Sequence, residues 1–193
     1  TGVGNQTRPN HTPTRRLIMD SLYFMVDELH VDGFRFDLAG ILGEEDLNYN
    51  TWADPHETVI GDIMEDPFLQ SRSVRLYAEP WTATAYSNLD TWSPISKFPT
   101  SESLDGYGWG EWNARFRDWW RSFINEGWTL QDQEGGLDGG ATLTGSYSLY
   151  GWNGRRPYHA TNFITVHDGF TMYDLLSYGE KQNGCGVLNP VCC

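Results

Sequence analysis

Residues 33–37, GFRFD, form a short run in which aromatic and charged side chains alternate. In an extended strand, successive side chains point to opposite faces, so Phe34 and Phe36 share one face while Arg35 and Asp37 share the other. An unpaired ion on a buried strand costs several kcal/mol, which a structural role seldom explains. A strand with one apolar and one charged face therefore predicts a functional site on the charged face.

Helices and strands are predicted to alternate along the chain. An amphipathic pattern predicts a helix that opens at Pro13 and ends before Gly33, and only a short link separates it from the strand. Asp54, Pro55 and Glu57 supply an N-cap, a first-turn proline and a capping-box partner for a second helix. A strand is expected over 74–81, followed by a long loop over 81–108. A short strand from Trp109 then leads into a helix that has its C-cap at Gly127 and carries an aromatic stripe: Trp112, Phe116, Trp119, Trp120 and Phe123. The last expected elements are a glycine-rich loop over 134–154, a strand over 161–168, and a short helix capped by Thr171 and Asp174. This order predicts a parallel α/β protein, with residues 1–193 in a single domain.

Charged residues stand where three of these strands give way to loops: Asp37, Glu79 and the pair His167 and Asp168. In a (β/α)8 barrel this end of the strands is the catalytic face. Two carboxylates that flank a glycosidic oxygen suffice for hydrolysis, because one protonates the leaving group and the other attacks the anomeric carbon or activates water. The pattern favours Asp37 and Glu79 as catalytic residues.

The neighbours of the two carboxylates suggest different roles for them. Arg35 lies on the same strand face as Asp37 and would hold that carboxylate ionised and aimed, as a nucleophile requires. Pro80 and Trp81 would wall Glu79 from water and favour its protonated form, as a general acid requires. Trp81 is also a candidate for contact with the substrate.

His167 and Asp168 complete the expected site. Asp168 would place a negative charge beneath an oxocarbenium-like transition state, and His167 would donate to sugar hydroxyls. Two other interpretations use the same residues. Arg35 and Asp37 could be a buried structural ion pair, or the three carboxylates and His167 could bind a divalent metal in a metallohydrolase. A single histidine without HxH spacing counts against the metal site.

Composition narrows the choice of partner. Acidic residues outnumber basic ones 26 to 13, and the only lysines are Lys97 and Lys181, so nucleic acid is not an expected partner. Nine tryptophans and ten tyrosines suit stacking on uncharged ligands such as sugars, although most such rings are core. No apolar run approaches the ~18 residues of a membrane span, so no membrane partner is expected.

Sequence features leave the compartment open. The first residues, TGVGNQTRPN, do not resemble a signal peptide, and they read as the middle of a domain. Cys185, Cys192 and Cys193 crowd into the last nine residues, and their pairing cannot be read from sequence. We expect a secreted or periplasmic location rather than a cytoplasmic one, where these cysteines would form disulfides with residues further downstream. The alternative is that the three cysteines are free thiols.

Three motifs in fixed order carry a family resemblance. VDGFRFDLA, LYAEPW and NFITVHDGFT together resemble the α-amylase superfamily, glycoside hydrolase family 13. GWGEWNARFRD at 108–118 and FTMYDLLSYGEKQN at 170–183 are similar to segments of the bacterial isoamylases and glycogen debranching enzymes. The resemblance runs over essentially the whole chain.

The resemblance implies a role for each candidate. Asp37 would be the nucleophile, Glu79 the general acid/base and Asp168 the transition-state stabiliser, with Arg35 and His167 as their partners. It also implies a retaining hydrolase of α-1,6 branch linkages in glycogen or amylopectin that needs no cofactor, while a calcium requirement cannot be read from this segment. A branching-type transglycosylase and a non-catalytic α-glucan-binding homologue stay open as alternatives.

The sequence departs from the family pattern in two respects. The Asp and Asn-His motif of the third barrel strand is absent, so we expect part of a (β/α)8 TIM barrel, from roughly the fourth strand to just past the seventh, that is inactive by itself. The family's EPWD reads EPWT, with Thr82 in the last place, and extra residues such as SESLDGYG lengthen the following loop. Both changes fall where branch recognition is expected, so they bear on the debranching specificity more than on the glycosidase chemistry.

Overall fold

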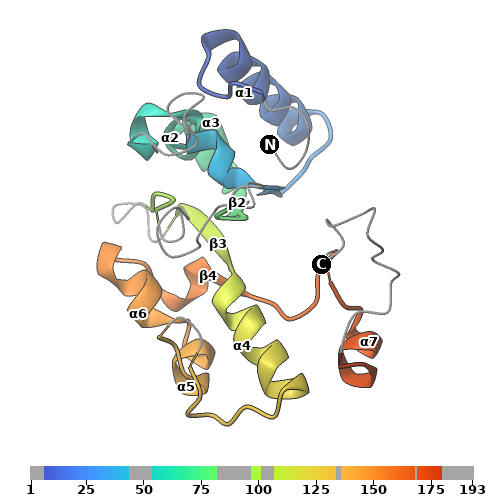
Figure 1. Ribbon diagram of the computed structural model, residues 1–193. Coiled ribbons are helices and arrows are strands. Elements are labelled where there is room, and N and C mark those ends of the chain that lie inside the picture. Colours follow the sequence, from blue (N-terminus) through green and yellow to red (C-terminus); the bar gives the residue numbers. More distant parts are fainter. Residues whose placement is uncertain are drawn as a thin grey trace. The chain divides into compact units, whose positions relative to one another are not determined.

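The computed structural model describes residues 7–43, 54–81, 97–100, 107–133, 136–167 and 169–179 (Figure 1). The chain divides into two compact units. The first comprises Thr1–Trp112 with Asn153–Arg155, and the second comprises Asn113–Trp152 with Arg156–Cys193. No helix in these described ranges is long and apolar enough to cross a membrane.

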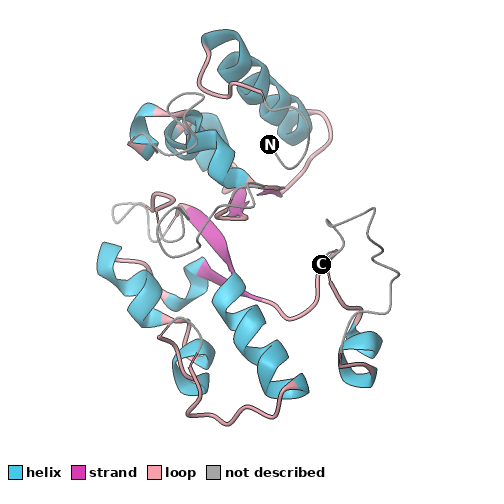
Figure 2. Ribbon diagram, in the orientation of Figure 1, coloured by secondary structure: helices cyan, strands magenta, loops and turns pink. Residues whose placement is uncertain are grey.

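Helices and short strands alternate in the first unit and helices predominate in the second (Figure 2). The elements up to the third strand are α1 (Thr12–Asp27), β1 (Gly33–Phe36), the 3-10 helices η1 (Ala39–Gly43) and η2 (Pro55–Glu57), α2 (Val59–Glu65), α3 (Pro67–Ser71), β2 (Arg75–Ala78) and β3 (Trp109–Asn113). The later elements are α4 (Ala114–Asn125), α5 (Gly139–Leu143), α6 (Tyr147–Tyr150), η4 (Gly151–Asn153), η5 (Pro157–His159), β4 (Ala160–Asn162) and α7 (Met172–Ser177).

The strands follow the order β1-β2-β3-β4, and the pairs β1/β2 and β2/β3 are parallel. Arg35 in β1 lies opposite Tyr77 in β2, which lies opposite Gly110 in β3. The next row joins Phe36, Ala78 and Glu111. The parallel α/β architecture predicted from the order of elements is therefore confirmed for these strands.

The apolar face of β1 packs into the core of the first unit. The Phe36 ring lies 4.9 Å from the Trp109 ring, and the Trp109 indole N–H donates to the carbonyl of Ile60 in α2 at 3.2 Å. The buried members of this core are Leu22, Val26, Ala39, Val59, Ile60, Ile63, Met64, Leu69, Val74, Leu76, Ala78, Phe98 and Trp109. As predicted, Phe34 and Phe36 face this apolar layer.

The predicted second helix is divided into the short elements η2 and α2, and a separate helix, α3, follows. Asp54 caps the 3-10 helix η2 instead, with its side chain accepting from the His56 N–H at 3.0 Å. Thr58 and Asp66 then cap α2 and α3 separately. Local side-chain caps therefore replace the continuous helix that the apolar spacing predicted.

Trp112 lies in β3 and not on the helix where its spacing to the other aromatic residues placed it. The helix begins later because Asn113 is its N-cap, with its side-chain oxygen accepting from the Phe116 N–H at 3.1 Å. α4 ends at Asn125, and Gly127 follows its cap residue with a positive φ of 72°. Glycine adopts this left-handed conformation at little cost, so the predicted stop signal is confirmed one residue after the cap.

The stretch 134–154 is not simply a loop, because its described part contains α5 and α6. The Asp138 side chain caps α5 by accepting from the Ala141 N–H at 2.8 Å. A Cβ on Gly139 would lie 2.7 Å from the Trp119 ring, so the glycine lets α5 approach α4 closely. The same glycine that suggested a loop serves here in helix packing.

The predicted strand 161–168 is much shorter in the structure. β4 ends at Asn162, so His167 lies well past the strand and not at its end. The last helix was predicted correctly, since Thr171 caps α7 by accepting from the Asp174 N–H at 3.1 Å. Of the predicted loop 81–108, residues 81, 97–100 and 107–108 are described, and they include a bridge between Thr100 and Gly108.

Candidate active site

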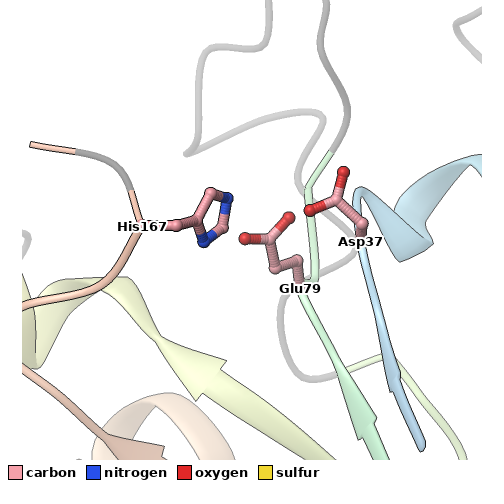
Figure 3. Close-up of side chains that lie close together, drawn as sticks. All are labelled: Asp37, Glu79 and His167. Atoms are coloured by element: carbon pink, nitrogen blue, oxygen red, sulfur yellow. The ribbon is translucent and has the colours of Figure 1, made fainter.

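Asp37 and Glu79 lie side by side at the ends of neighbouring strands (Figure 3). The parallel register pairs Phe36 with Ala78, and the Glu79 N–H donates to the Phe36 carbonyl at 3.0 Å. Each carboxylate therefore follows a paired residue on its own strand. An oxygen of Asp37 and an oxygen of Glu79 lie within 4.8 Å of each other, as predicted from their positions at strand ends.

One guanidinium binds both carboxylates. Arg35 donates from Nη1 to Oδ1 of Asp37 at 2.7 Å and from Nη2 to Oε1 of Glu79. The sequence predicted the partnership with Asp37, because both residues lie on one face of β1, but not the partnership with Glu79. The arrangement gives two neighbouring negative charges a shared counter-ion, which reduces the repulsion between them.

The two carboxylates differ sharply in exposure. The Asp37 side chain is 61 % exposed, whereas the Glu79 side chain is 4 % exposed. Oε2 of Glu79 also accepts from the Leu38 N–H at 2.8 Å, and Leu38 has a positive φ of 45°. That conformation is unfavourable for leucine, and it turns the backbone N–H that follows Asp37 toward Glu79.

Trp112 belongs to this site, although its spacing had assigned it to a core stripe. The centre of the Arg35 guanidinium lies 4.2 Å from the centroid of the Trp112 ring. A signal for this position exists in the sequence, because Trp112 follows Gly110 by two residues and so shares its strand face. That signal could be used only once residues 109–113 were known to be a strand.

A buried ion pair lies on the opposite face of β3. Oε1 of Glu111 is 3.1 Å from Nη2 of Arg155, and neither side chain is exposed. Both residues also bind Phe98: Glu111 accepts from its N–H at 3.1 Å, and Arg155 donates to its carbonyl. This pair therefore attaches the segment 97–100 to the strand whose other face carries Trp112.

Trp81, His167 and Asp168 are the other predicted site residues. Trp81 is half-buried and directly follows the Glu79–Pro80 pair, and its carbonyl accepts from the Gly40 N–H at 3.1 Å. His167 lies in the second compact unit, and Asp168 lies outside the described residues. The roles assigned to these residues remain predictions.

Sequence comparisons identify relatives over nearly the whole chain. The glycogen operon protein GlgX homolog of Mycobacterium tuberculosis is 38 % identical over 183 residues, which are 95 % of this chain and 22 % of that protein. The isoamylase of a Flavobacterium species is 35 % identical over 189 residues, again 95 % of this chain and 22 % of that protein. The maize isoamylase SU1 is 36 % identical over 203 residues, 94 % of this chain and 23 % of that protein. The chain thus spans about a fifth of the length of these curated relatives. No family model matches it.

Solved structures show the same fold. The pullulanase from Anoxybacillus sp. LM18-11 complexed with maltotetraose matches with a TM-score of 0.60 and 23 % identity, over 92 % of this chain and 23 % of that one. The type I pullulanase from Bacillus subtilis complexed with maltose matches with a TM-score of 0.59, with the same identity and coverage. These matches and the parallel strands support a partial TIM-barrel-like fold. The chain is therefore a homologue of the isoamylase and GlgX proteins, as its resemblance to the debranching branch of the α-amylase superfamily predicted.

Proposed function

We propose that this chain forms part of the catalytic barrel of a retaining glycoside hydrolase that cleaves α-1,6 branch linkages in glycogen or amylopectin. In this proposal the segment runs from roughly the fourth barrel strand to just past the seventh. The observation that carries it is the pair of carboxylates, Asp37 and Glu79, held by one guanidinium at adjacent strand ends. The names of the isoamylase and GlgX relatives support the α-glucan substrate and the branch linkage.

The separation of the two carboxylates supports retention. Retaining glycosidases have carboxyl groups ~5–5.5 Å apart, whereas inverting enzymes leave ~6.5–9.5 Å for a water molecule between them. An oxygen of Asp37 lies within 4.8 Å of an oxygen of Glu79, which is compatible with the shorter class.

Exposure supports Asp37 as the nucleophile, and the family resemblance assigns the acid/base role to Glu79. Asp37, whose side chain is largely exposed, is accessible to the anomeric carbon, which it attacks to form a covalent glycosyl-enzyme as the glycosidic bond breaks. Glu79 protonates the departing glycosidic oxygen, and to do so it must exchange its bond from Arg35, which favours the carboxylate, for a proton. In the second step Glu79 takes a proton from water, the water oxygen attacks the anomeric carbon, and Asp37 leaves as a carboxylate. Both proton transfers therefore use the same group in opposite directions.

Arg35 prepares the nucleophile for the first step. Its bond to Oδ1 of Asp37 favours the ionised carboxylate that nucleophilic attack requires. The proposed contributions of Asp168 beneath the transition state and of His167 at sugar hydroxyls rest on the sequence motif alone. No step of this chemistry requires a cofactor.

The alternatives predict different products or ligands. A branching-type transglycosylase would form the same glycosyl-enzyme but pass the sugar to a hydroxyl of another glucan. A divalent metal between Asp37 and Glu79 is disfavoured, because the Arg35 guanidinium already bonds to both carboxylates and would oppose a second cation. A non-catalytic glucan-binding role needs neither acid, and both are present.

Product analysis tests the proposal in the full-length protein that carries this sequence. Incubation with amylopectin should release linear maltooligosaccharides together with new reducing ends. New branches without a gain in reducing ends would indicate a transglycosylase. An activated fluoro-sugar should label Asp37 covalently, and label on another residue would overturn the assignment of the nucleophile.

Matched variants separate catalysis from folding. Asp37→Asn and Glu79→Gln change one atom each in the site and should lower kcat by at least about 100-fold, in line with general acid–base and nucleophilic roles. Asp20→Asn is the control, because Asp20 lies on α1 with 61 % of its side chain exposed and should leave activity unchanged. Full activity in Glu79→Gln would favour the non-catalytic alternative.

A further inference from the structure

The charged face of the sheet continues from β1 across to β3. Because opposite residues of parallel strands share a face, Arg35, Tyr77 and Gly110 lie in one row on the same side. Side chains alternate along each strand, so Glu79 and Trp112, each two residues further on, lie on that side too. Trp112 is therefore the β3 side chain on the face that carries the carboxylates.

Gly110 explains why no side chain of β3 precedes Trp112 on this face. A Cβ at Gly110 would lie 2.9 Å from Cδ1 of the Tyr77 ring, which is closer than such contacts normally are. The glycine thus leaves room for Tyr77, and the next β3 side chain on this face lies nearer the strand end. That is where the guanidinium of Arg35 meets the indole ring.

The Trp112 ring and the two carboxylates contact the Arg35 guanidinium at the same time. Arg35 donates to Asp37 and Glu79 through separate nitrogens while its central carbon lies 4.2 Å from the Trp112 ring centroid. A cation over an aromatic face is attracted to the ring, and more strongly when it is withdrawn from water. The Arg35 side chain is 28 % exposed, so it is partly withdrawn from water. This attraction opposes the side-chain entropy of an unrestrained arginine.

We propose that Trp112 is a positioning residue: its indole face holds the Arg35 guanidinium in the one orientation that serves both carboxylates. The consequence for catalysis rests on the proposed function, but the positioning itself does not. Without the ring, Arg35 gains other rotamers and water reaches its free side. Asp37 and Glu79 then lose their fixed relation to each other.

The effect on catalysis should appear in kcat rather than in KM. Arg35 contacts the catalytic carboxylates, and a misplacement of about 1 Å at a reacting group can cost roughly 100-fold in rate. We expect Trp112→Leu in the full-length protein to lower kcat roughly 10- to 100-fold on amylopectin, with KM changed less than about twofold. Trp112→Phe retains an aromatic face and should stay within about fivefold of the parent. A rise in KM with unchanged kcat would instead identify Trp112 as a sugar-stacking platform and overturn the proposal.

A second measurement does not depend on activity. In the 15N-arginine-labelled full-length protein, the Nε–H signal of Arg35, assigned by its loss in Arg35→Lys, should exchange with water about tenfold faster in Trp112→Leu, equivalent to ~1.4 kcal/mol. Trp112→Phe should keep most of the protection. Trp152→Leu, which removes a tryptophan that is 70 % exposed, should change nothing.

The two measurements separate the two proposals. Slow exchange that depends on Trp112, in a protein that releases no sugar, would sustain the positioning role and remove the proposed hydrolase. Equal exchange in the parent and in Trp112→Leu would overturn the positioning role whatever the activity. If Trp112→Leu disturbs the sheet, seen as lost protection of the Tyr77 amide, Trp112→Met decides by the same criterion, because it keeps apolar bulk without an aromatic face.

Discussion

Removal of one partner of the buried Glu111–Arg155 pair should destabilise the chain severely. Neither side chain is exposed, and their charged atoms lie 3.1 Å apart. Breaking a buried pair costs ~3–5 kcal/mol, because the remaining charge stays in a low-dielectric environment without its counter-ion. We therefore expect Arg155→Met and Glu111→Leu each to lower the free energy of unfolding by about that amount.

The double variant should be more stable than either single variant. It buries no charge, and its main loss is the pair of hydrogen bonds to the Phe98 N–H and carbonyl. At about 1 kcal/mol for each bond, the double variant should lose ~2 kcal/mol. The single changes are therefore expected to be strongly non-additive, as for residues in direct contact.

Urea unfolding of the four proteins, followed by tryptophan fluorescence, measures this difference. With a slope of ~2 kcal/mol per molar urea, each single variant should unfold at a midpoint lower by about 1.5–2.5 M, and the double variant at a midpoint lower by about 1 M. Exposed Arg16→Met, whose side chain is 84 % exposed, is the matched control and should shift the midpoint little. Single variants that lose less than about 1 kcal/mol, or a double variant equal to their sum, would refute the reasoning from burial.

Three further predictions concern residues away from the carboxylates. Asn113→Ala should lower the free energy of unfolding by about 2–4 kcal/mol in urea unfolding, because it removes the α4 cap and two hydrogen bonds, at 2.8 Å to Ser146 and 3.0 Å to Asn162. Asn113→Asp keeps the capping oxygen but buries a charge and loses both donated bonds, so it should be no more stable than Asn113→Ala. Gly139→Ala should cost about 1–3 kcal/mol by the same measurement, because its Cβ would meet the Trp119 ring. Gly140→Ala, whose Cβ would lie 3.4 Å from Oδ1 of Asp138, is the control. The pKa of Tyr23 is raised to about 12 by its hydrogen bond to Asp66 together with desolvation, and that of Tyr107 is raised to about 12 chiefly by burial. The unfolded chain loses both protons near pH 10 and the folded chain retains them, so the free energy of unfolding should fall as the pH rises from 10 to 12. This fall, followed as the midpoint of urea unfolding, should be smaller in Tyr23→Phe and in Tyr107→Phe. An unchanged fall in both variants would contradict the assignment.

The charged site was predictable where short-range alternation controls it. GFRFD shows from its own spacing that Arg35 and Asp37 share a face opposite Phe34, and the structure has them so. The proximity of Glu79 to Asp37 was predictable from a parallel sheet, because the carboxyl ends of its strands lie at one edge. Both inferences need only the period of a strand and the direction of pairing.

Features that depend on a choice between two local structures were not predictable. The spacing of Trp112, Phe116 and Trp119 fits a helix, and only the cap formed by Asn113 fixes the boundary that leaves Trp112 in β3. The bond between Arg35 and Glu79 likewise joins residues 44 positions apart. Its geometry depends on the register of β1 with β2, which side-chain spacing within either strand does not specify.

Neighbouring residues of β3 point to opposite faces of the sheet. The strand therefore links the Glu111–Arg155 pair on one face with the carboxylate site around Arg35 on the other. Glu111 enters the apolar face, where Arg155 neutralises it, and Trp112 enters the charged face, where it meets Arg35. A one-residue slip in register would exchange these side chains, placing a tryptophan in the ion pair and an unpaired carboxylate beside Asp37 and Glu79. The Glu111–Arg155 pair therefore penalises the wrong register of β3, and the correct register is the one that presents the indole to Arg35. A buried ion pair that adds little net stability can in this way still specify the geometry of the site on the other face of the sheet.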